Sequence, residues 1–228
     1  MREAPEWTDL LDAAIDDVVE AVSDAPDLAV PVPACPEWTL AGLVDHLREV
    51  HWWAAHAITE QSPDGSAPPV GLDRDALVAG YVSAAEHLLD IFRATPAQTP
   101  AWTFGTDRTV AFWLRRQAHE VTLHLRDALQ ALGRTAEWSI DPGFAWDGVE
   151  EVATVFYPRQ VRLERTAPLP GTLRLQAEDL DETLDLGQGE PYGVISGPAA
   201  DVLLTLWRRR GADDAVAAEL LEKTAVTP

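Results

Sequence analysis

The chain has 228 residues, which is enough for one or two domains, and its 46% hydrophobic content with nine Trp excludes a disordered protein. Its formal charge of -21 repels phosphate backbones and anionic lipids, so we expect neither a nucleic acid nor a membrane partner. We find no apolar run of about 18 residues and no secretory signal, and the single cysteine, Cys35, suits a reducing compartment, so we predict a cytoplasmic protein.

Apolar residues recur at spacings of three and four through the first part of the chain, which is typical of amphipathic helices. We predict four long helices, at about 6–24, 39–61, 74–94 and 108–132. The side chains of Thr39, Asp73 and Asp107 can each accept from a free backbone N–H and cap a helix, and Gly133 can end the last one. Residues 1–138 are therefore predicted to form a four-helix bundle.

The sequence pattern changes from helical to mixed helical and strand-like after this bundle. A short helical stretch at about 144–160 precedes three strand-like segments, TLRLQAED, ETLDLGQG and PYGVISG, which Gly and Pro separate. A last amphipathic helix, PAADVLLTLWRRR, and a polar tail follow. The predicted fold class is α with a smaller α+β domain, the latter over residues 139–228.

The fourth helix carries the most informative polar residues. With Val110 at the centre of the buried face, both Glu120 and His124 point inward, and their i, i+4 spacing stacks them on one face at a distance suited to a shared ion. A buried carboxylate needs a cation, which is either such an ion or an Arg from another helix beside an ordinary core His. We expect His119 to face solvent, and Leu123 stands where the zincin motif HExxH needs its second His.

The second helix holds three histidines. His56 falls outside its apolar arc, whereas His46 and His51 lie at opposite edges, about 140° apart, so one straight helix cannot direct both at one ion. Either could be a third ligand, and helix angles leave the choice open. His87, on the third helix, has no second His or ligand-spaced carboxylate and is interpreted as structural.

Three stretches carry a resemblance to a known family. VPACPEWTLAGLVDHLREVHWWA, RTVAFWLRRQAHEVTLHLRDALQALG and GPAADVLLTLWRRR are similar to the opening, the fourth helix and the close of the mycothiol-dependent maleylpyruvate isomerase family. The family is a branch of the DinB-like four-helix bundles, here with a small α+β C-terminal domain. The resemblance therefore implies a DinB-like bundle for residues 1–138.

The resemblance also implies chemistry. It implies a divalent metal, usually zinc, held by His46, Glu120 and His124, and it favours His46 over His51. Two His and one carboxylate leave a coordination position open, which a cofactor thiol such as mycothiol can enter as its thiolate. In the isomerase, that thiolate adds to a conjugated double bond, the resulting single bond rotates, and elimination returns the thiolate. The expected substrate is a small electrophilic organic acid, and the same metal-bound thiolate could instead transfer its sulfur to such an electrophile.

A cation is needed near the negative charge that develops on the substrate. Arg208, Arg209 and Arg210 are catalytic candidates, although cations at a helix end also complement its dipole.

Two other function classes stay open. One is a metal-dependent hydrolase with water in the open coordination position, and the other is a non-catalytic protein that binds a small molecule or a partner. We expect Cys35 to be a packed thiol or a bystander, and four tryptophans to be core rather than pocket residues: Trp52, Trp53, Trp102 and Trp113.

Overall fold

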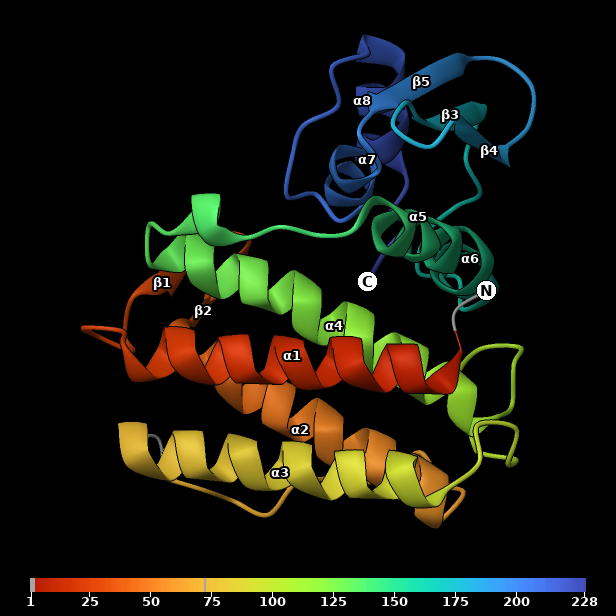
Figure 1. The fold of residues 1–228 in the computed structure, drawn as a ribbon. Coiled ribbons are helices and arrows are strands. Elements are labelled where there is room, and N and C mark those ends of the chain that lie inside the picture. Colours follow the sequence, from red (N-terminus) through yellow and green to blue (C-terminus); the bar gives the residue numbers. More distant parts are fainter. Residues whose placement is uncertain (1–2, 72) are drawn as a thin grey trace. The chain divides into compact units, whose positions relative to one another are not determined.

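The chain folds into two compact units, Met1–Trp138 and Ser139–Pro228, in a computed structural model that describes residues 3–71 and 73–228. The first unit is mainly helical and the second combines helices with a three-stranded sheet (Figure 1). The predicted fold class, α with a smaller α+β domain, is confirmed.

Four long helices build the first unit: α1 Ala4–Ser23, α2 Leu40–Thr59, α3 Arg74–Ala94 and α4 Val110–Ala131. Helix α1 packs against α3 and α4, and α2 also packs against both of these, as in a four-helix bundle (Figure 1). The predicted caps of α2 and α3 are confirmed, because Thr39 accepts from the amide of Gly42 and Asp73 from the amide of Ala76. The predicted cap of α4 is wrong: its N-cap is Thr109, and Asp107 instead accepts from the Thr109 hydroxyl at 2.8 Å.

A short antiparallel hairpin precedes α2, in the stretch between the first two predicted helices. Strand β1 Pro31–Val32 pairs with β2 Cys35–Thr39. The prolines in this stretch remove N–H donors, which conceals so short a ladder from sequence patterns. The hairpin leads directly into α2, since the amide of Leu40 donates to the carbonyl of Val30 at 2.9 Å.

Helix α4 is buried on nearly every side, which corrects one expectation from the sequence. We expected His119 to face solvent, but it is only 1% exposed. The reason is that α1 covers this side of α4, with the ring of Trp7 edge-on to His119 at 5.5 Å between centroids. A helical wheel identifies the most apolar face, but it does not show how many neighbours a central helix has.

Aromatic side chains pack around the N-terminal part of α4. Trp113 is fully buried, its indole N–H donates to the carbonyl of Trp102, and Trp53 packs edge-on against it at 4.8 Å. Phe104 stacks on Trp53, and on another part of the bundle Trp52 packs against the exposed His87 at 4.7 Å. Such ring pairs contribute stability beyond their buried area. Of the four tryptophans expected in the core, Trp113 is buried, whereas Trp52, Trp53 and Trp102 are partly exposed.

The second unit begins with three consecutive helical segments, α5 Pro142–Glu151, the π-helix η2 Val152–Phe156 and α6 Tyr157–Arg162. Its sheet has the strand order β4-β3-β5, with β3 Thr172–Ala177 antiparallel to β4 Glu182–Gly187 and parallel to β5 Tyr192–Gly197. Helix α7 Ala199–Leu206 packs on α5 and the sheet, and α8 Ala215–Lys223 packs on β5.

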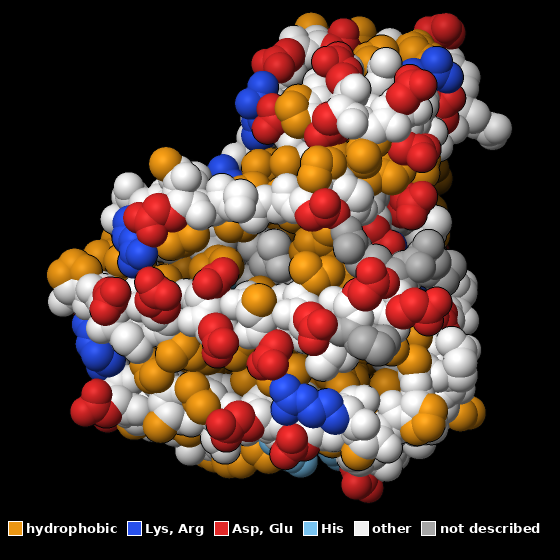
Figure 2. Space-filling model, viewed as in Figure 1, with side chains coloured by type: hydrophobic (Ala, Val, Ile, Leu, Met, Phe, Trp, Pro, Cys, Tyr) orange, Lys and Arg blue, Asp and Glu red, His pale blue; other side chains and the backbone are white. Residues whose placement is uncertain are grey.

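The surface reflects the composition. Acidic side chains outnumber basic ones across the face of the first unit that Figure 2 shows, in line with the net charge of -21. Among the described residues, no helix is long and apolar enough to cross a membrane.

Candidate metal centre

Two helices of the bundle bring His46, Glu120 and His124 together. From α2, Nε2 of His46 lies 2.9 Å from Oε1 of Glu120 on α4, and Nε2 of His124, one turn further along α4, lies 3.4 Å from the same oxygen. The three candidate ligand atoms all lie within 4.8 Å of one another. Two imidazole nitrogens and a carboxylate oxygen that converge in this way are a donor set that suits zinc and related divalent ions.

The carboxylate of Glu120 has a cationic partner on its own helix. Nη2 of Arg116, one turn earlier, lies 2.8 Å from Oε2 of Glu120, and the Arg116 side chain is only 4% exposed. Although burial opposes ionisation, the charge of Arg116 and hydrogen bonds from His124 and His46 hold the pKa of Glu120 well below its usual range. The carboxylate is therefore ionised and can act as a ligand at neutral pH.

His124 is held by a second carboxylate. Its Nδ1 lies 3.0 Å from Oδ2 of Asp127, which is fully buried. Burial disfavours the imidazolium, but hydrogen bonds to Asp127 and Glu120, with their charges, raise the pKa of His124 to about 9. Without a metal the ring therefore carries a proton on each nitrogen at neutral pH, with Nδ1 facing Asp127 and Nε2 facing Glu120. A cation bound at Nε2 would displace only the proton on that nitrogen, while Nδ1 keeps its proton and donates it to Asp127. Such outer carboxylates commonly orient a metal-binding histidine.

An indole from the hairpin covers both histidine rings. Trp38 on β2 has its ring centroid 4.6 Å from that of His46 and 5.8 Å from that of His124. The centre is still reachable by a small molecule, because the side chains of His46 and Glu120 are 29% and 16% exposed. Trp38, Arg116 and Asp127 were not identified from the sequence. Two of them could have been predicted from helical spacing, because Arg116 lies four residues before Glu120 and Asp127 lies three residues after His124.

We expect Asp127→Asn to weaken metal binding about 10- to 100-fold, the usual cost of losing such an outer partner. The reason is that the amide nitrogen of the new side chain can donate to Nδ1 of His124 and leave the proton on Nε2, where the metal would bind. Metal affinity is measured by competition with a chromophoric chelator. The control is Asp12→Asn on α1, whose ion pair with Arg93 is exposed. An unchanged affinity in Asp127→Asn would show that this carboxylate does not orient His124.

His51, the other candidate on α2, lies elsewhere. Its Nδ1 is 2.7 Å from Oε1 of Gln117, its ring stacks on Tyr81 at 5.4 Å, and the side chain is fully buried. Among the described residues, Nε2 of His51, the Tyr81 hydroxyl and Nε2 of Gln117 have no hydrogen-bond partner. Burial lowers the pKa of His51 to about 4, so the ring is neutral and packed in the bundle core.

The buried His51 predicts a loss of stability in mild acid. A histidine in the unfolded chain takes up a proton near pH 6.5, whereas folded His51 does so only near pH 4, so the free energy of unfolding falls across this interval by roughly 3 kcal/mol. Denaturant unfolding at a series of pH values measures this decrease. His51→Gln, which cannot titrate, should show a correspondingly smaller decrease, and equal decreases in both proteins would contradict the assignment.

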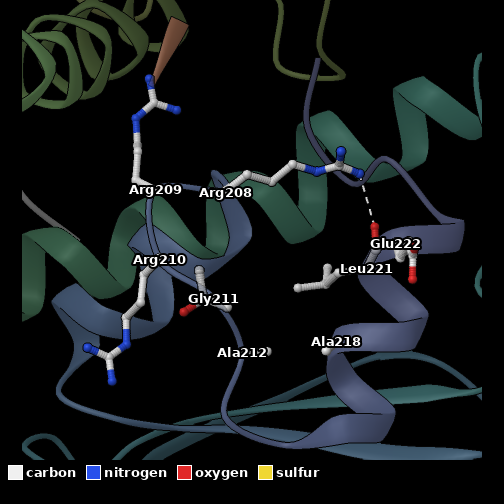
Figure 3. A pocket seen from close by; sticks show the side chains of 9 residues that line it. Arg208, Arg209, Arg210, Gly211, Ala212, Ala218, Leu221 and Glu222 are labelled. Atoms are coloured by element: carbon white, nitrogen blue, oxygen red, sulfur yellow. Dashed lines mark hydrogen bonds between the residues drawn. The ribbon is translucent and has the colours of Figure 1, made fainter. Parts of the chain in front are cut away.

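The arginine run 208–210 lies in the second unit, just after α7, beside a pocket of about 430 Å³ (Figure 3). The three side chains leave the chain in different directions. Arg208 donates to the carbonyl of Leu221 at 3.0 Å, and Arg209 donates to the carbonyl of Trp207 and lies over its ring at 5.7 Å. Arg210 forms ion pairs with Asp213 at 3.2 Å and Asp201 at 3.5 Å. All three line the pocket.

Comparison with known proteins adds two findings. Residues 8–129 match the family model of the mycothiol maleylpyruvate isomerase N-terminal domain. The fold is similar to crystal structures of the mycothiol-dependent maleylpyruvate isomerase and of a histidine-to-alanine mutant of it, with TM-scores of 0.68 and 0.69. In both comparisons the identity is 16%, and the match covers 95% of this chain and 94% of the other. No curated protein sequence matches the chain.

Proposed function

The chain belongs to the mycothiol maleylpyruvate isomerase family, and from this membership we propose that it is a metal- and mycothiol-dependent isomerase. Its substrate is a small electrophilic organic acid of the maleylpyruvate kind. The metal is a divalent ion, zinc in the first instance, with His46, Glu120 and His124 as ligands. S-transfer from the same thiol to an electrophile is the nearest variant of this activity.

The observation that carries the proposal is the convergence of two imidazoles and one carboxylate at a partly exposed position. Nε2 of His46 and Nε2 of His124 lie 2.9 and 3.4 Å from one oxygen of Glu120. A set of three protein ligands leaves a coordination position for an exogenous group, which is the arrangement of catalytic rather than structural zinc sites.

A bound divalent ion would supply the positive charge that keeps the cofactor's sulfur ionised near neutral pH. The surrounding residues prepare the site for it. Arg116 keeps Glu120 ionised, Asp127 holds the proton of His124 on Nδ1, and the Trp38 ring restricts how the two imidazoles can rotate. The open edge beside His46 admits the thiol and the substrate.

A metal-free alternative uses the same contacts. Glu120 with Arg116, and a protonated His124 with Asp127, would form a buried ion-pair network that needs no metal. This network explains the burial of the charges, and His46 can join it by donating a ring N–H to Glu120 at 2.9 Å. A metal-free network corresponds to the non-catalytic function class, and the metal content of the purified protein distinguishes it from the proposed metalloenzyme.

We also propose that one guanidinium of the run Arg208, Arg209 and Arg210 binds the carboxylate of the substrate. An arginine suits this role because its planar donors match a carboxylate. Replacing that arginine by alanine should lower kcat/KM about 100-fold, whereas the other two variants stay within a few-fold of the wild type. Steady-state kinetics of the three single variants test this, and three unchanged values would exclude the run from the reaction.

The test of the proposed function is elemental analysis of the purified protein followed by assays with maleylpyruvate. We expect about one divalent ion per chain and turnover only when mycothiol is present. Turnover of a hydrolysable substrate without thiol would support the hydrolase alternative. A folded chain without metal, inactive after incubation with zinc, would support the non-catalytic alternative.

A further inference from the structure

A second group of metal-binding side chains lies beside the candidate metal centre and shares one residue with it. Sγ of Cys35 on β2, a ring nitrogen of His124 and a carboxylate oxygen of Asp127 all lie within 4.8 Å of one another. We propose that Cys35, His124 and Asp127 form a second metal site, selective for thiophilic divalent cations such as Cd²⁺, which competes with the first site for His124.

The donor atoms give the two sites different preferences. The first site offers nitrogen and oxygen only, whereas the second adds the sulfur of Cys35, the one thiol of the chain. Soft cations prefer thiolate ligands, so they favour the second site, and a borderline ion such as Zn²⁺ suits both. A thiolate and a carboxylate also neutralise the two charges of the cation.

The surroundings allow a cation to enter. Cys35 is partly exposed, whereas Asp127 is fully buried, so the site is open on the cysteine side only. When the cation binds, the thiol proton leaves to solvent and the thiolate becomes a ligand. Nη1 of Arg126 lies 4.0 Å from Oδ1 of Asp127, while Oδ2 lies 3.0 Å from Nδ1 of His124.

Competition follows from the imidazole ring, which lies between the two sites. Nε2 of His124 is 3.4 Å from Oε1 of Glu120, and Nδ1 is 3.0 Å from Oδ2 of Asp127. A neutral imidazole has one free lone pair, because its other nitrogen carries the proton. A metal on Nδ1 therefore places the proton on Nε2 and excludes a metal from the first site. This competition rests on the proposed function, whereas the second site itself does not.

The experiment is a titration of the metal-free protein with Cd²⁺, followed by the ultraviolet charge-transfer absorption of a thiolate–metal bond. We expect this absorption in the wild type and in His46→Ala, which removes a ligand of the first site only. Cys35→Ser should lack it. Asp127→Asn and His124→Asn should weaken Cd²⁺ binding to the thiolate, and asparagine at position 124 keeps a polar partner beside Asp127. No absorption in the wild type, or unchanged affinity in both asparagine variants, would overturn the site.

A second titration tests competition. Protein loaded with Zn²⁺ is titrated with Cd²⁺ while a chromophoric chelator reports released Zn²⁺. We expect the charge-transfer absorption to rise together with Zn²⁺ release, and absorption without release would overturn the competition. A different result is expected if His46, Glu120 and His124 do not bind metal at all. The wild type and His46→Ala would then bind Zn²⁺ equally well, and the Cd²⁺ absorption of His46→Ala would be unaffected.

Discussion

Replacing His124 by alanine is expected to remove the bound metal and to abolish turnover. This imidazole is 3.4 Å from Glu120, and the loss of a direct ligand should cost more than the 10- to 100-fold typical of an outer partner, so we expect a decrease in metal affinity of over about 100-fold. His46→Ala and Glu120→Ala should also lower the affinity for Zn²⁺ and abolish turnover, because each removes a ligand of this site. Metal per chain after dialysis, and kcat/KM, are the measurements.

Controls separate the loss of a ligand from the loss of the fold. His119→Gln changes the residue next to Glu120, but its ring packs toward Trp7 on α1, so metal content should stay at the wild-type value. His87→Ala is an exposed change on α3 with the same expectation. His124→Asn retains a polar group beside Asp127 and should fold, yet still lack metal. Full retention of metal in folded His124→Asn would contradict the assignment.

Mycothiol is expected to bind the metal-loaded protein at least about 100-fold more tightly than the metal-free protein, a difference of about 2.7 kcal/mol in binding free energy. A divalent ion with two neutral histidines and the ionised Glu120 keeps a net positive charge, for which a thiolate is a good further ligand. Calorimetric titration of both forms measures the two affinities.

The matched ligand for this experiment is S-methyl mycothiol, which has the same sugar and cysteine groups but no ionisable thiol. It should bind both forms with equal, weak affinity. If mycothiol itself showed equal affinity for the two forms, or no binding at millimolar concentration, the thiol would have no part in the reaction. The hydrolase alternative, in which water takes the open position and ionises, would then be favoured.

Local sequence patterns predicted the helices well because their signals are short-range. The spacing of apolar residues placed α1 to α4 to within about two residues at each end, and two of the three proposed N-caps, Thr39 and Asp73, accept the expected amide protons. The i, i+4 pair Glu120 and His124 was also readable, because a helix alone brings these side chains together. The same reasoning would have reached Arg116 and Asp127.

Contacts between different helices could not be predicted from helical spacing. Helix angles could not choose between His46 and His51, because an angle describes a side chain relative to its own helix and not which neighbour lies beside it. In the structure both contact α4, one at Glu120 and the other at Gln117. The same limitation explains the wrong expectation for His119, which α1 covers.

The sequence by itself therefore determined the helical class, the helix ends and the pairing of Glu120 with His124, all of which depend on contacts within one turn of a helix. The family resemblance, and not helix geometry, pointed to His46. Only the tertiary structure decided that Trp38 covers two imidazoles and that Cys35 lies beside His124, which is far from it along the chain. These contacts depend on how a two-stranded hairpin packs against α4, and packing between distant segments leaves no periodic signal in a single sequence.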